Sequence, residues 1–259
     1  MAEQPELGDA FGALMRAAWA GCTGVGVRPT VGGVRPVPAI EIVERDDGFI
    51  SASPADKYLH GPDQWQPYDR RALARVGGRT LDIGAGAGRL ALALQERGVE
   101  VVALDVSPGA VAVAADRGVR ATVCATVDEH AERAASAYDC FAMFGNNLGL
   151  LESRQRAPGF LAALAAMARP GATIIAQGTD PYRTTDELHT AYHGRNRRLG
   201  RMPGQLRLRV RYRNLATAWF DYLLCSPEEL AELVHASPWR VADVDQADQP
   251  FYLATLGLR

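Results

Sequence analysis

Apolar and polar positions alternate regularly through the middle of the chain. Short apolar runs are separated by segments in which apolar residues recur with a helical period of about 3.6 residues. Ser107 and Pro108 mark the start of one helix, and Gly98 and Gly118 mark helix ends. The predicted strands are 80–83, 99–105, 119–125, 138–144 and 172–177, and the predicted helices are 86–97, 107–118, 128–135 and 157–168. This alternation predicts a parallel sheet covered on both faces, doubly wound by right-handed crossovers.

The segment before this region has a different pattern. Apolar residues of 9–20 recur at helical spacing, which predicts an amphipathic helix with one buried face. Two strand-like runs within 39–50 flank Asp47-Gly48, a dipeptide typical of a β-hairpin turn. We therefore expect a helix and a hairpin ahead of the main sheet.

The pattern changes again after residue 178. Residues 185–200 predict a helix, whereas 205–214, QLRLRVRYRN, alternate strictly between apolar residues and arginines. Such alternation is typical of a half-buried antiparallel strand, and 215–225 can pair back with it. The rest of the chain predicts a helix over 227–236 that begins after Ser226, and an antiparallel pair of strands over 239–248 and 250–258.

Composition and charge narrow the class of protein. The chain has 259 residues and a formal net charge of −2, so no overall basic field attracts it to nucleic acid. Its four cysteines are widely spaced, and Cys124 and Cys140 fall in predicted buried strands, which favours free thiols in a reducing compartment. No apolar run reaches the roughly 20 residues that span a bilayer, and the N-terminus lacks the basic region of a secretion signal. We expect a soluble, cytoplasmic protein.

The sequence LDIGAGAGRL at 81–90 places three glycines between a predicted strand and a predicted helix. Such a turn lets backbone N–H groups and a helix N-terminus approach a ligand closely. The dinucleotide fingerprint GxGxxG is not met, because Arg89 stands where it needs its third glycine, and no Gly-Lys-Ser/Thr of a P-loop follows. Asp82 precedes the turn, and Asp105 ends the next strand, where a carboxylate can accept ribose hydroxyls.

Residues 76–111, VGGRTLDIGAGAGRLALALQERGVEVVALDVSPGAV, resemble the cofactor site of class I S-adenosylmethionine-dependent methyltransferases. The resemblance extends over 77–177, and the terminal strand pair fits the reversed last strand of that family. It implies an α/β fold with a doubly wound, Rossmann-like sheet of seven strands whose last strand is reversed. We expect an N-terminal helix and lid over 1–70, and a main domain over 71–259 with an antiparallel hairpin inserted at about 178–225.

The resemblance implies S-adenosylmethionine as the cofactor and assigns its adenosine half to matching positions. Asp105 would bind the ribose diol, and Val106 would pack on adenine. Ala125 and Thr126, after the third strand, would flank adenine. Many relatives place an Asp there to meet the adenine amine, whereas the first Asp after this predicted strand comes later, at position 128.

At the methionine end, the resemblance places Asp82 near the amino group and Tyr58 of the lid near the carboxylate. The residues that would line this end are Gly84, Ala85 and Gly86 after the first strand and Phe144, Gly145 and Asn146 after the fourth. Two more aromatic residues of the lid segment have two interpretations: Trp65 and Tyr68 either wall an apolar or aromatic substrate or pack beneath the lid.

Catalytic residues are expected outside the cofactor segments, because methyl transfer at a sulfonium mainly needs a positioned nucleophile and, for some acceptors, a base. His189 and His193 stand one helical turn apart, with Asp186 one turn before them. They are candidates for proton transfer or substrate contact, with packing as the alternative; HxxxH alone predicts no metal site. Asn147 either orients a polar group of the substrate or, with Asn146, shapes a turn.

The stretch from 195 to 213 contains eight arginines and no acid. It either recognises an anionic small molecule or an RNA backbone, or it forms an ordinary solvated strand face. A looser resemblance of 180–224 to uncharacterised actinobacterial methyltransferases names no substrate.

These observations lead to one main hypothesis and two alternatives. The main one is transfer of a methyl group from S-adenosylmethionine to a small molecule, anionic or aromatic, by in-line displacement. The alternatives are an RNA methyltransferase and a protein of the same fold that acts as a cyclase or a binding protein without methylating. No membrane partner is expected, and the sequence leaves the oligomeric state open.

Overall fold

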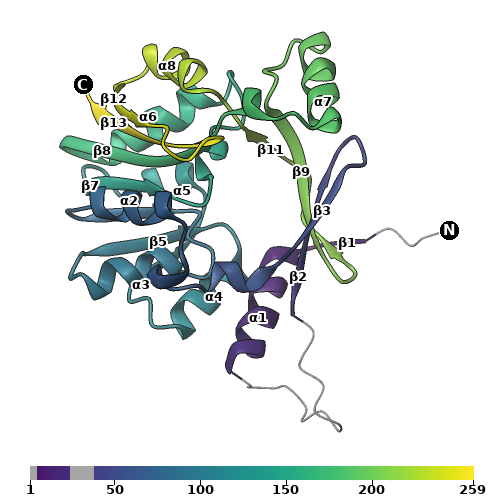
Figure 1. Ribbon diagram of the computed structural model, residues 1–259. Helices are drawn as coiled ribbons and strands as arrows, with labels where there is room; N and C mark the ends of the chain where they lie inside the picture. Colours follow the sequence, from purple (N-terminus) through teal and green to yellow (C-terminus); the bar gives the residue numbers. More distant parts are fainter. Residues whose placement is uncertain (1–4, 24–37) are drawn as a thin grey trace, which may run out of the picture.

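The computed structural model describes residues 5–23 and 38–259, which form two β-sheets and their surrounding helices (Figure 1). Sheet B has seven strands in the order β12-β13-β8-β7-β4-β5-β6. Only β13 runs antiparallel to its neighbours, so the predicted seven-stranded sheet with a reversed last strand is confirmed. Its strands are β4 (Thr80–Ile83), β5 (Val101–Asp105), β6 (Thr122–Cys124), β7 (Tyr138–Met143), β8 (Ala168–Thr179), β12 (Trp239–Asp245) and β13 (Phe251–Leu258).

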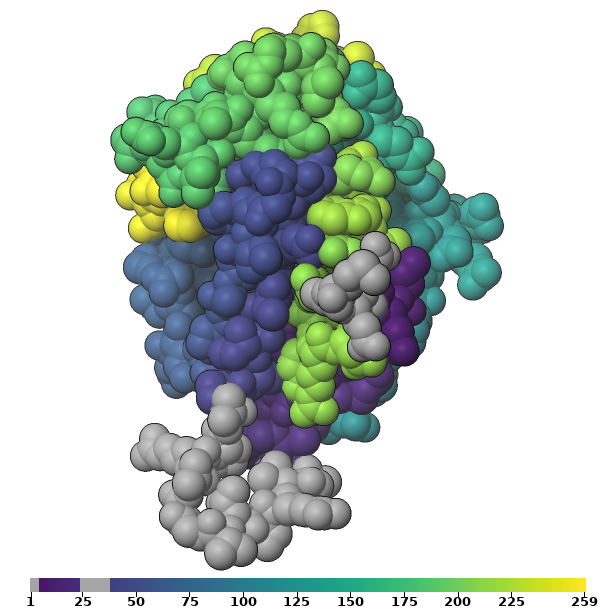
Figure 2. Space-filling view, turned by 90° about the vertical axis from the view of Figure 1, so that its right-hand side faces the viewer, coloured from purple at the N-terminus to yellow at the C-terminus, as the bar shows by residue number. Residues whose placement is uncertain are grey.

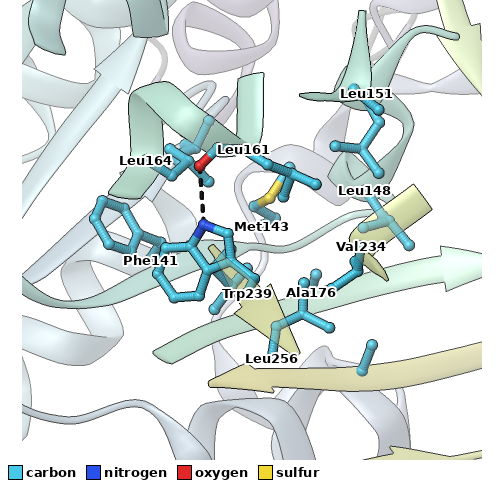
Figure 3. Close-up of a cluster of buried hydrophobic side chains, with 14 of the residues drawn as sticks. Phe141, Met143, Leu148, Leu151, Leu161, Leu164, Ala176, Val234, Trp239 and Leu256 are labelled. Atoms are coloured by element: carbon cyan, nitrogen blue, oxygen red, sulfur yellow. Dashed lines mark hydrogen bonds between the residues drawn. The ribbon is translucent and has the colours of Figure 1, made fainter. Parts of the chain in front are cut away.

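Helices cover both faces of sheet B, as the sequence pattern predicts. The helices are α2 (Pro67–Arg75), α3 (Arg89–Glu96), α4 (Pro108–Asp116), α5 (Val127–Ala131), α6 (Ala157–Met167) and α8 (Pro227–His235). On one face, α6 and α8 pack on a core that contains the fully buried Trp239, whose indole N–H donates to Leu161 O at 2.8 Å (Figure 3). On the other face, α2 and α3 pack on a second core that includes Leu90 and Leu94.

Several element bounds differ from the sequence prediction for local reasons. The turn residues Gly86 and Gly88 have positive φ, so α3 begins at Arg89 and not at 86. The strand β8 begins at Ala168, directly after α6, because Ala168 pairs with Tyr138. The expected strand 119–125 shortens to β6, which lies at the sheet edge.

Sheet A joins the two parts of the chain that flank the main sheet. It contains β1 (Glu6–Leu7), β2 (Ile40–Arg45), β3 (Ile50–Pro54), β9 (Gln205–Tyr212), β10 (Leu215–Ala216) and β11 (Phe220–Leu223). The predicted hairpins are confirmed, since β2 pairs with β3, and β10 and β11 pair with β9. In addition β2 pairs with β9, so the lid segment and the insertion form one sheet. Figure 2 shows the outer face of this sheet, with β2 and β3 beside the strands of the insertion.

Three further elements connect the sheets. The helix α1 (Ala10–Thr23) packs against α4, and η1 (Ala55–Tyr58) follows β3. The helix α7 (Glu187–Arg198) lies above the β2–β3 hairpin in Figure 2. The boundary expected between residues 70 and 71 lies within α2, so one helix contains the last residues of the lid segment and the first residues of the main domain.

All four cysteines lie within the residues that the structure describes. All four cysteines are free; Cys140 and Cys225 are buried. Cys124 is exposed, and the expectation of burial was wrong because β6 is an edge strand. Within 5–23 and 38–259, no helix combines the length and apolar character required to cross a membrane.

Candidate active site

The glycine turn follows β4, all four of whose residues are buried. Gly84, Gly86 and Gly88 have φ of +67°, +55° and +76°, in the left-handed region that favours glycine. A Cβ on Gly84 would lie 2.5 Å from Asn147 Nδ2, so a side chain at this position would also collide with its neighbour. The N–H groups of Gly84 and Ala85 donate to Leu104 O at 2.9 and 3.0 Å, which ties the turn to β5.

Asp105 ends β5 directly beside this turn. Its two carboxylate oxygens accept from the N–H groups of Gly86 and Ser107, each at 2.8 Å. Burial raises the pKa of the Asp105 carboxyl, and these two hydrogen bonds oppose the rise. The next residue, Val106, is 66% exposed although it is apolar. A carboxylate beside an open apolar side chain is a surface that suits a nucleoside, with polar contact for ribose and apolar contact for a base.

Ala125 and Thr126 lie beyond β6, on the same edge of sheet B as Val106. Thr126 is the N-cap of α5, and its hydroxyl accepts from Glu129 N at 3.2 Å. Glu129 in turn accepts from Thr126 N at 2.8 Å. This reciprocal cap fixes the backbone of the segment that the resemblance assigns to adenine.

Asp82 is fully enclosed at the end of β4. Its Oδ2 is buried and lacks a hydrogen-bond partner among the described residues. Burial raises the pKa of Asp82 to about 7; Arg89 lowers it and Asp105 raises it further. An unpartnered carboxylate oxygen here is a fit for the ammonium group of an amino acid, which would supply the missing donor and charge.

The N-terminal helix and η1 cover the glycine turn. Asp9, just before α1, accepts from Ser107 Oγ at 2.7 Å and from Gly109 N at 2.8 Å, which joins α1 to the start of α4. Phe11 reaches within 3.7 Å of the position that a Cβ on Gly86 would take. Its ring meets the Tyr58 ring edge to face, with centroids 5.3 Å apart. The Phe11 and Tyr58 rings thus cover the glycine turn.

Tyr58 makes a different polar contact from the one that the sequence suggests. Its hydroxyl donates to Glu41 Oε1 at 2.8 Å, and Lys57 Nζ donates to Glu41 Oε2 at the same distance. Burial, together with the nearby Glu41 charge, raises the pKa of Tyr58 well above its ordinary value. The Tyr58 ring therefore borders the site, while its hydroxyl hydrogen is used by Glu41.

The exit of β7 forms the opposite side of the site. Phe144 is buried, and Gly145 N–H donates to Gln177 Oε1 at 2.6 Å. Asn146 has a positive φ of 70°; its Oδ1 accepts from Thr179 Oγ1 at 2.9 Å and its carbonyl accepts from Tyr222 OH at 2.6 Å. The end of β7 is thus linked to β8 and to β11 of sheet A.

Asn147 contacts the backbone of the glycine turn. Its Nδ2 donates to Ile83 O and Gly84 O, both at 2.9 Å. Both amide hydrogens are therefore used to hold the turn. These contacts give Asn147 a positioning role, and contact of its Oδ1 with a substrate stays a prediction.

The two histidines of α7 face a cavity of about 540 Å³ between α7, sheet A and the end of β8. His189 Nδ1 lies 3.0 Å from Arg45 Nη1, and the His189 ring meets Phe49 edge to face. His193 is buried, and burial lowers its pKa, followed by the charges of Arg197, His189 and Arg45. Within the part of the chain that the structure describes, no group of three or more His, Cys, Asp or Glu side chains is arranged to hold a metal ion.

The cavity has apolar walls with charged and polar side chains at one side. The apolar residues come from sheet A and from the turn before β13: Val43, Phe49, Leu206, Leu208, Leu224 and Pro250. The polar ones come mainly from the end of β8, the segment that follows it and α7: Arg45, Ser51, Thr179, Asp180, Arg183, Thr184, Thr185, Asp186, His189 and His193. Thr179 also bonds Asn146, so the cavity adjoins the exit of β7.

Trp65 and Tyr68 do not line this cavity. Trp65 is buried, and its indole N–H donates to His60 O at 2.8 Å. Tyr68 stacks on Phe251, with ring centroids 5.2 Å apart. Of the two interpretations, the structure favours packing for both residues.

The arginines of β9 are paired with acids that lie elsewhere in the sequence. Arg209 and Arg211 both bond Glu44 of β2, and Arg207 bonds Asp221 of β11. The stretch of arginines in the sequence therefore does not form a continuous basic surface in the structure. This pairing removes much of the charge that an RNA backbone would require.

Several site residues were missed by sequence reasoning. Glu41 and Arg45 are buried charges on β2, and Asp69 and Gln177 form a buried pair at 2.9 Å. The sequence does indicate that Glu41 and Arg45 are buried, because the alternation along 40–45 puts them on the same strand face as Val43. Asp69 and Gln177 carry no such signal, because their contact joins elements 108 residues apart.

Comparisons with known proteins point to a methyltransferase domain. Residues 80–171 match the methyltransferase domain family. Ubiquinone biosynthesis O-methyltransferase of Hahella chejuensis is 32% identical over 112 residues, which cover 41% of this chain and 45% of that protein. The match therefore spans less than half the length of that curated relative.

Solved structures match over a longer part of the chain. A SAM-dependent methyltransferase from Bacteroides fragilis, in complex with S-adenosyl-L-homocysteine, is 26% identical with a TM-score of 0.77 over 98% of both chains. The CcbJ methyltransferase from Streptomyces caelestis shares the fold, with a TM-score of 0.57 and 14% identity over 76% of this chain and 98% of that one.

The strand order, the glycine turn with its two acids and these matches support a class I S-adenosylmethionine-dependent methyltransferase. The methyltransferase domain match covers residues 80–171, and the whole chain shares the fold of the Bacteroides fragilis enzyme. This domain implies S-adenosylmethionine as the cofactor.

Proposed function

We propose that the protein transfers a methyl group from S-adenosylmethionine to a small molecule bound in the cavity between sheet A and α7. The observation that carries this proposal is the position of the cavity. Thr179 lines it and is hydrogen-bonded to Asn146, at the strand exit where the family places the methyl group. The matched O-methyltransferase of Hahella chejuensis is in keeping with a small acceptor.

The cofactor would lie across the ends of β4, β5, β6 and β7. Asp105 would accept the ribose hydroxyls, Val106 would pack on adenine, and Asp82 would meet the ammonium group. The remaining residues that would enclose it are Tyr58, Gly84, Ala85, Gly86, Ala125, Thr126, Phe144, Gly145 and Asn146. When bound, the cofactor supplies a methyl group on a positively charged sulfur.

The two histidines have different hydrogen-bonding environments, which suggests different roles. The Arg45 guanidinium donates to His189 Nδ1, so a neutral His189 carries its proton on Nε2 and acts as a donor. His193 has a lowered pKa and is neutral at pH 7, so one of its nitrogens is free to accept a proton. We assign His193 as the base that accepts the proton and His189 as a residue that orients the small molecule to be methylated.

The lining of the cavity suggests the chemical class of the acceptor. Its apolar walls, including Phe49, favour an aromatic or largely apolar body. Of the two arginines in this lining, Arg183 is the more exposed; its Nε is paired with Asp180 at 3.2 Å, and its other N–H groups would favour a carboxylate or phenolate group. The proposed acceptor is a small aromatic molecule with a hydroxyl or amino group to be methylated. RNA is not favoured, because the β9 arginines are paired.

Two measurements test the proposal. Calorimetric titration with S-adenosylhomocysteine should show one binding site per chain; no binding would contradict the proposal. Incubation with S-adenosylmethionine and a panel of small phenols, aromatic acids and amines should release S-adenosylhomocysteine. With a positive acceptor, His193→Gln should lower kcat about 100-fold. His235→Gln, an exposed position on α8, should leave kcat unchanged.

A further inference from the structure

Arg89 places a guanidinium group beside the glycine turn, at the first residue of α3. Its side chain is 18% exposed and lies over the Trp65 ring, with 5.0 Å between Cζ and the ring centroid. Its Nη2 lies 3.8 Å from the position that a Cβ on Gly145 would take. The guanidinium therefore bridges the exits of β4 and β7, the two strands between which the methionine end of the cofactor is expected.

Asp69 of α2 holds this guanidinium in place. Arg89 Nη1 and Nη2 donate to the two Asp69 oxygens, both at 3.4 Å. Asp69 is only 3% exposed and accepts from Gln177 Nε2 at 2.9 Å, while Gln177 Oε1 accepts from Gly145 N–H. The contacts to Asp69 are long and use two of the five N–H groups of an arginine. The remaining donors are available to a ligand carboxylate.

Asp82, which precedes the glycine turn in the sequence, provides a negative charge to complement the positive charge of Arg89, which follows the turn. Its unpartnered Oδ2 suits an ammonium group, as described above. Burial raises the pKa of Asp82, and Arg89 is close enough to be the charge that lowers it. An α-amino acid carries one ammonium and one carboxylate. The turn is thus flanked by one complementary charge for each end of that zwitterion.

The other donor expected at this end is already engaged. Tyr58 has a single hydroxyl hydrogen, and it is donated to Glu41 at 2.8 Å. Arg89 is the cation that lies beside both Asp82 and Gly145. A guanidinium also matches a carboxylate better than a hydroxyl does, because it can donate two parallel hydrogen bonds.

We propose that Arg89 binds the α-carboxylate of S-adenosylmethionine, with Asp69 as the positioning residue that aims its guanidinium. This inference rests on the proposed function, since it assumes that the cofactor occupies the site. Arg89 stands where a dinucleotide-binding turn needs its third glycine. By this proposal, Arg89 recognises the carboxylate of an amino acid at the place where a dinucleotide-binding turn would bind a pyrophosphate.

A pair of ligands that differ by one carboxylate tests the inference directly. Calorimetry would measure the Kd of S-adenosylmethionine and of decarboxylated S-adenosylmethionine with the whole chain. The unsubstituted protein should bind the first about 10- to 100-fold more tightly, the range of a charge-assisted hydrogen bond. In Arg89→Gln this ratio should fall to within about threefold of one, while the affinity for the decarboxylated ligand changes by less than about threefold.

Two further variants separate recognition from folding. Arg97→Gln is the matched control, because Arg97 also joins α3 to α2, through Leu73 O at 2.6 Å, and should keep the full ratio. Arg89→Lys keeps the charge without the planar fork and should give an intermediate ratio. If a melting experiment shows that Arg89→Gln does not fold, the ratio of the two Kd values in Arg89→Lys tests the inference instead.

The outcomes distinguish this inference from the proposed function. If Arg89→Gln weakens both ligands equally, or leaves the ratio intact, Arg89 is a structural link and the inference is wrong. A ratio near one in the unsubstituted protein also overturns it. If the unsubstituted protein binds neither S-adenosylmethionine nor S-adenosylhomocysteine, the proposed function itself fails.

Discussion

Sheet B and sheet A hold their polar groups in different ways. At the carboxyl ends of sheet B, Asp105 is held by backbone N–H groups, and Asp82 is buried with an oxygen left unpartnered. In sheet A, side chains pair with side chains, as Glu44 does with Arg209 and Arg211. A group held by backbone depends on the fold, whereas a side-chain pair can be exchanged without changing the backbone. The proposed cofactor side is therefore set by the fold, and the proposed acceptor side is more open to variation in sequence.

The largest expected difference between the sheets is in stability. Trp239→Ala removes a fully buried indole beneath α6 and should lower the free energy of unfolding by about 4 kcal/mol. Leu208→Ala, in the half-buried wall of the cavity, should cost about 1 kcal/mol. Urea unfolding followed by circular dichroism measures both. Equal costs would show that sheet A is as tightly packed as sheet B.

Cofactor affinity should depend much more on the acids at the end of sheet B than on the ion pairs of sheet A. Asp105→Asn removes the charge beside the ribose position and should weaken S-adenosylhomocysteine binding about 30-fold, or about 2 kcal/mol. The matched variant Glu44→Gln, in sheet A, should change the affinity by less than about twofold. Calorimetry gives both constants. A large loss in Glu44→Gln would mean that sheet A takes part in holding the cofactor.

The unpartnered Asp82 should make cofactor binding depend on pH. Burial raises the pKa of Asp82 to about 7 in the ligand-free protein, whereas an ammonium partner favours its charged form. Affinity should therefore rise on the order of tenfold as pH increases from 5.5 to 7.5, with proton release on binding. Calorimetry in buffers of different ionisation enthalpy measures that release. In Asp82→Asn the affinity should be lower and the dependence flat.

The same raised pKa affects the stability of the ligand-free protein, with a definite sign. Protonated Asp82 is the favoured form in the fold, so its contribution is fully present below its ordinary pKa of 3.8 and is lost as pH rises through about 7. Thermal melts between pH 4 and 8 should show this decline, and Asp82→Asn should reduce it. An unchanged decline would assign it to other groups.

The smallest expected effect concerns the ion pairs of sheet A. Hydrogen bonds from Arg209, opposed by partial burial, lower the pKa of Glu44, and Arg211 adds to the lowering. Their stabilisation is present above the ordinary pKa of 4.5 and is lost as pH falls below it. Glu44→Gln should cost about 0.5 to 1 kcal/mol at pH 7 and less at pH 3. Urea unfolding at the two pH values tests this.

The sequence was most informative where each element carries its own signal. The strands β4, β5 and β7 are mostly apolar because helices cover both faces, and Ser107 and Ser226 cap helices as expected. Asp82 adjoins the glycine turn in the sequence, and Asp105 ends the next strand, so local patterns sufficed to predict the cofactor site. The pairing of β2 with β9 could not be predicted, because an amphipathic strand does not encode its partner.

The acceptor side was predicted only in part for the same reason. His189 and His193 were found from their spacing on one helix, and the structure brings both to the cavity. Arg45, which contacts His189, comes from a strand 144 residues away in the chain, and no local pattern joins the two. Asp69, which holds Arg89, likewise lies on a different element from its partner.

The joining of β2 to β9 has a consequence for how the molecule is made. Strands β4 to β8 follow one another in the chain and can pair as they leave the ribosome. Glu44 and Arg211 are 167 residues apart, so β2 waits unpaired with β9 until most of the protein has been synthesised. Closing so long a loop is slow. The wall of the proposed acceptor cavity is thus expected among the last parts to form, after sheet B has begun to assemble.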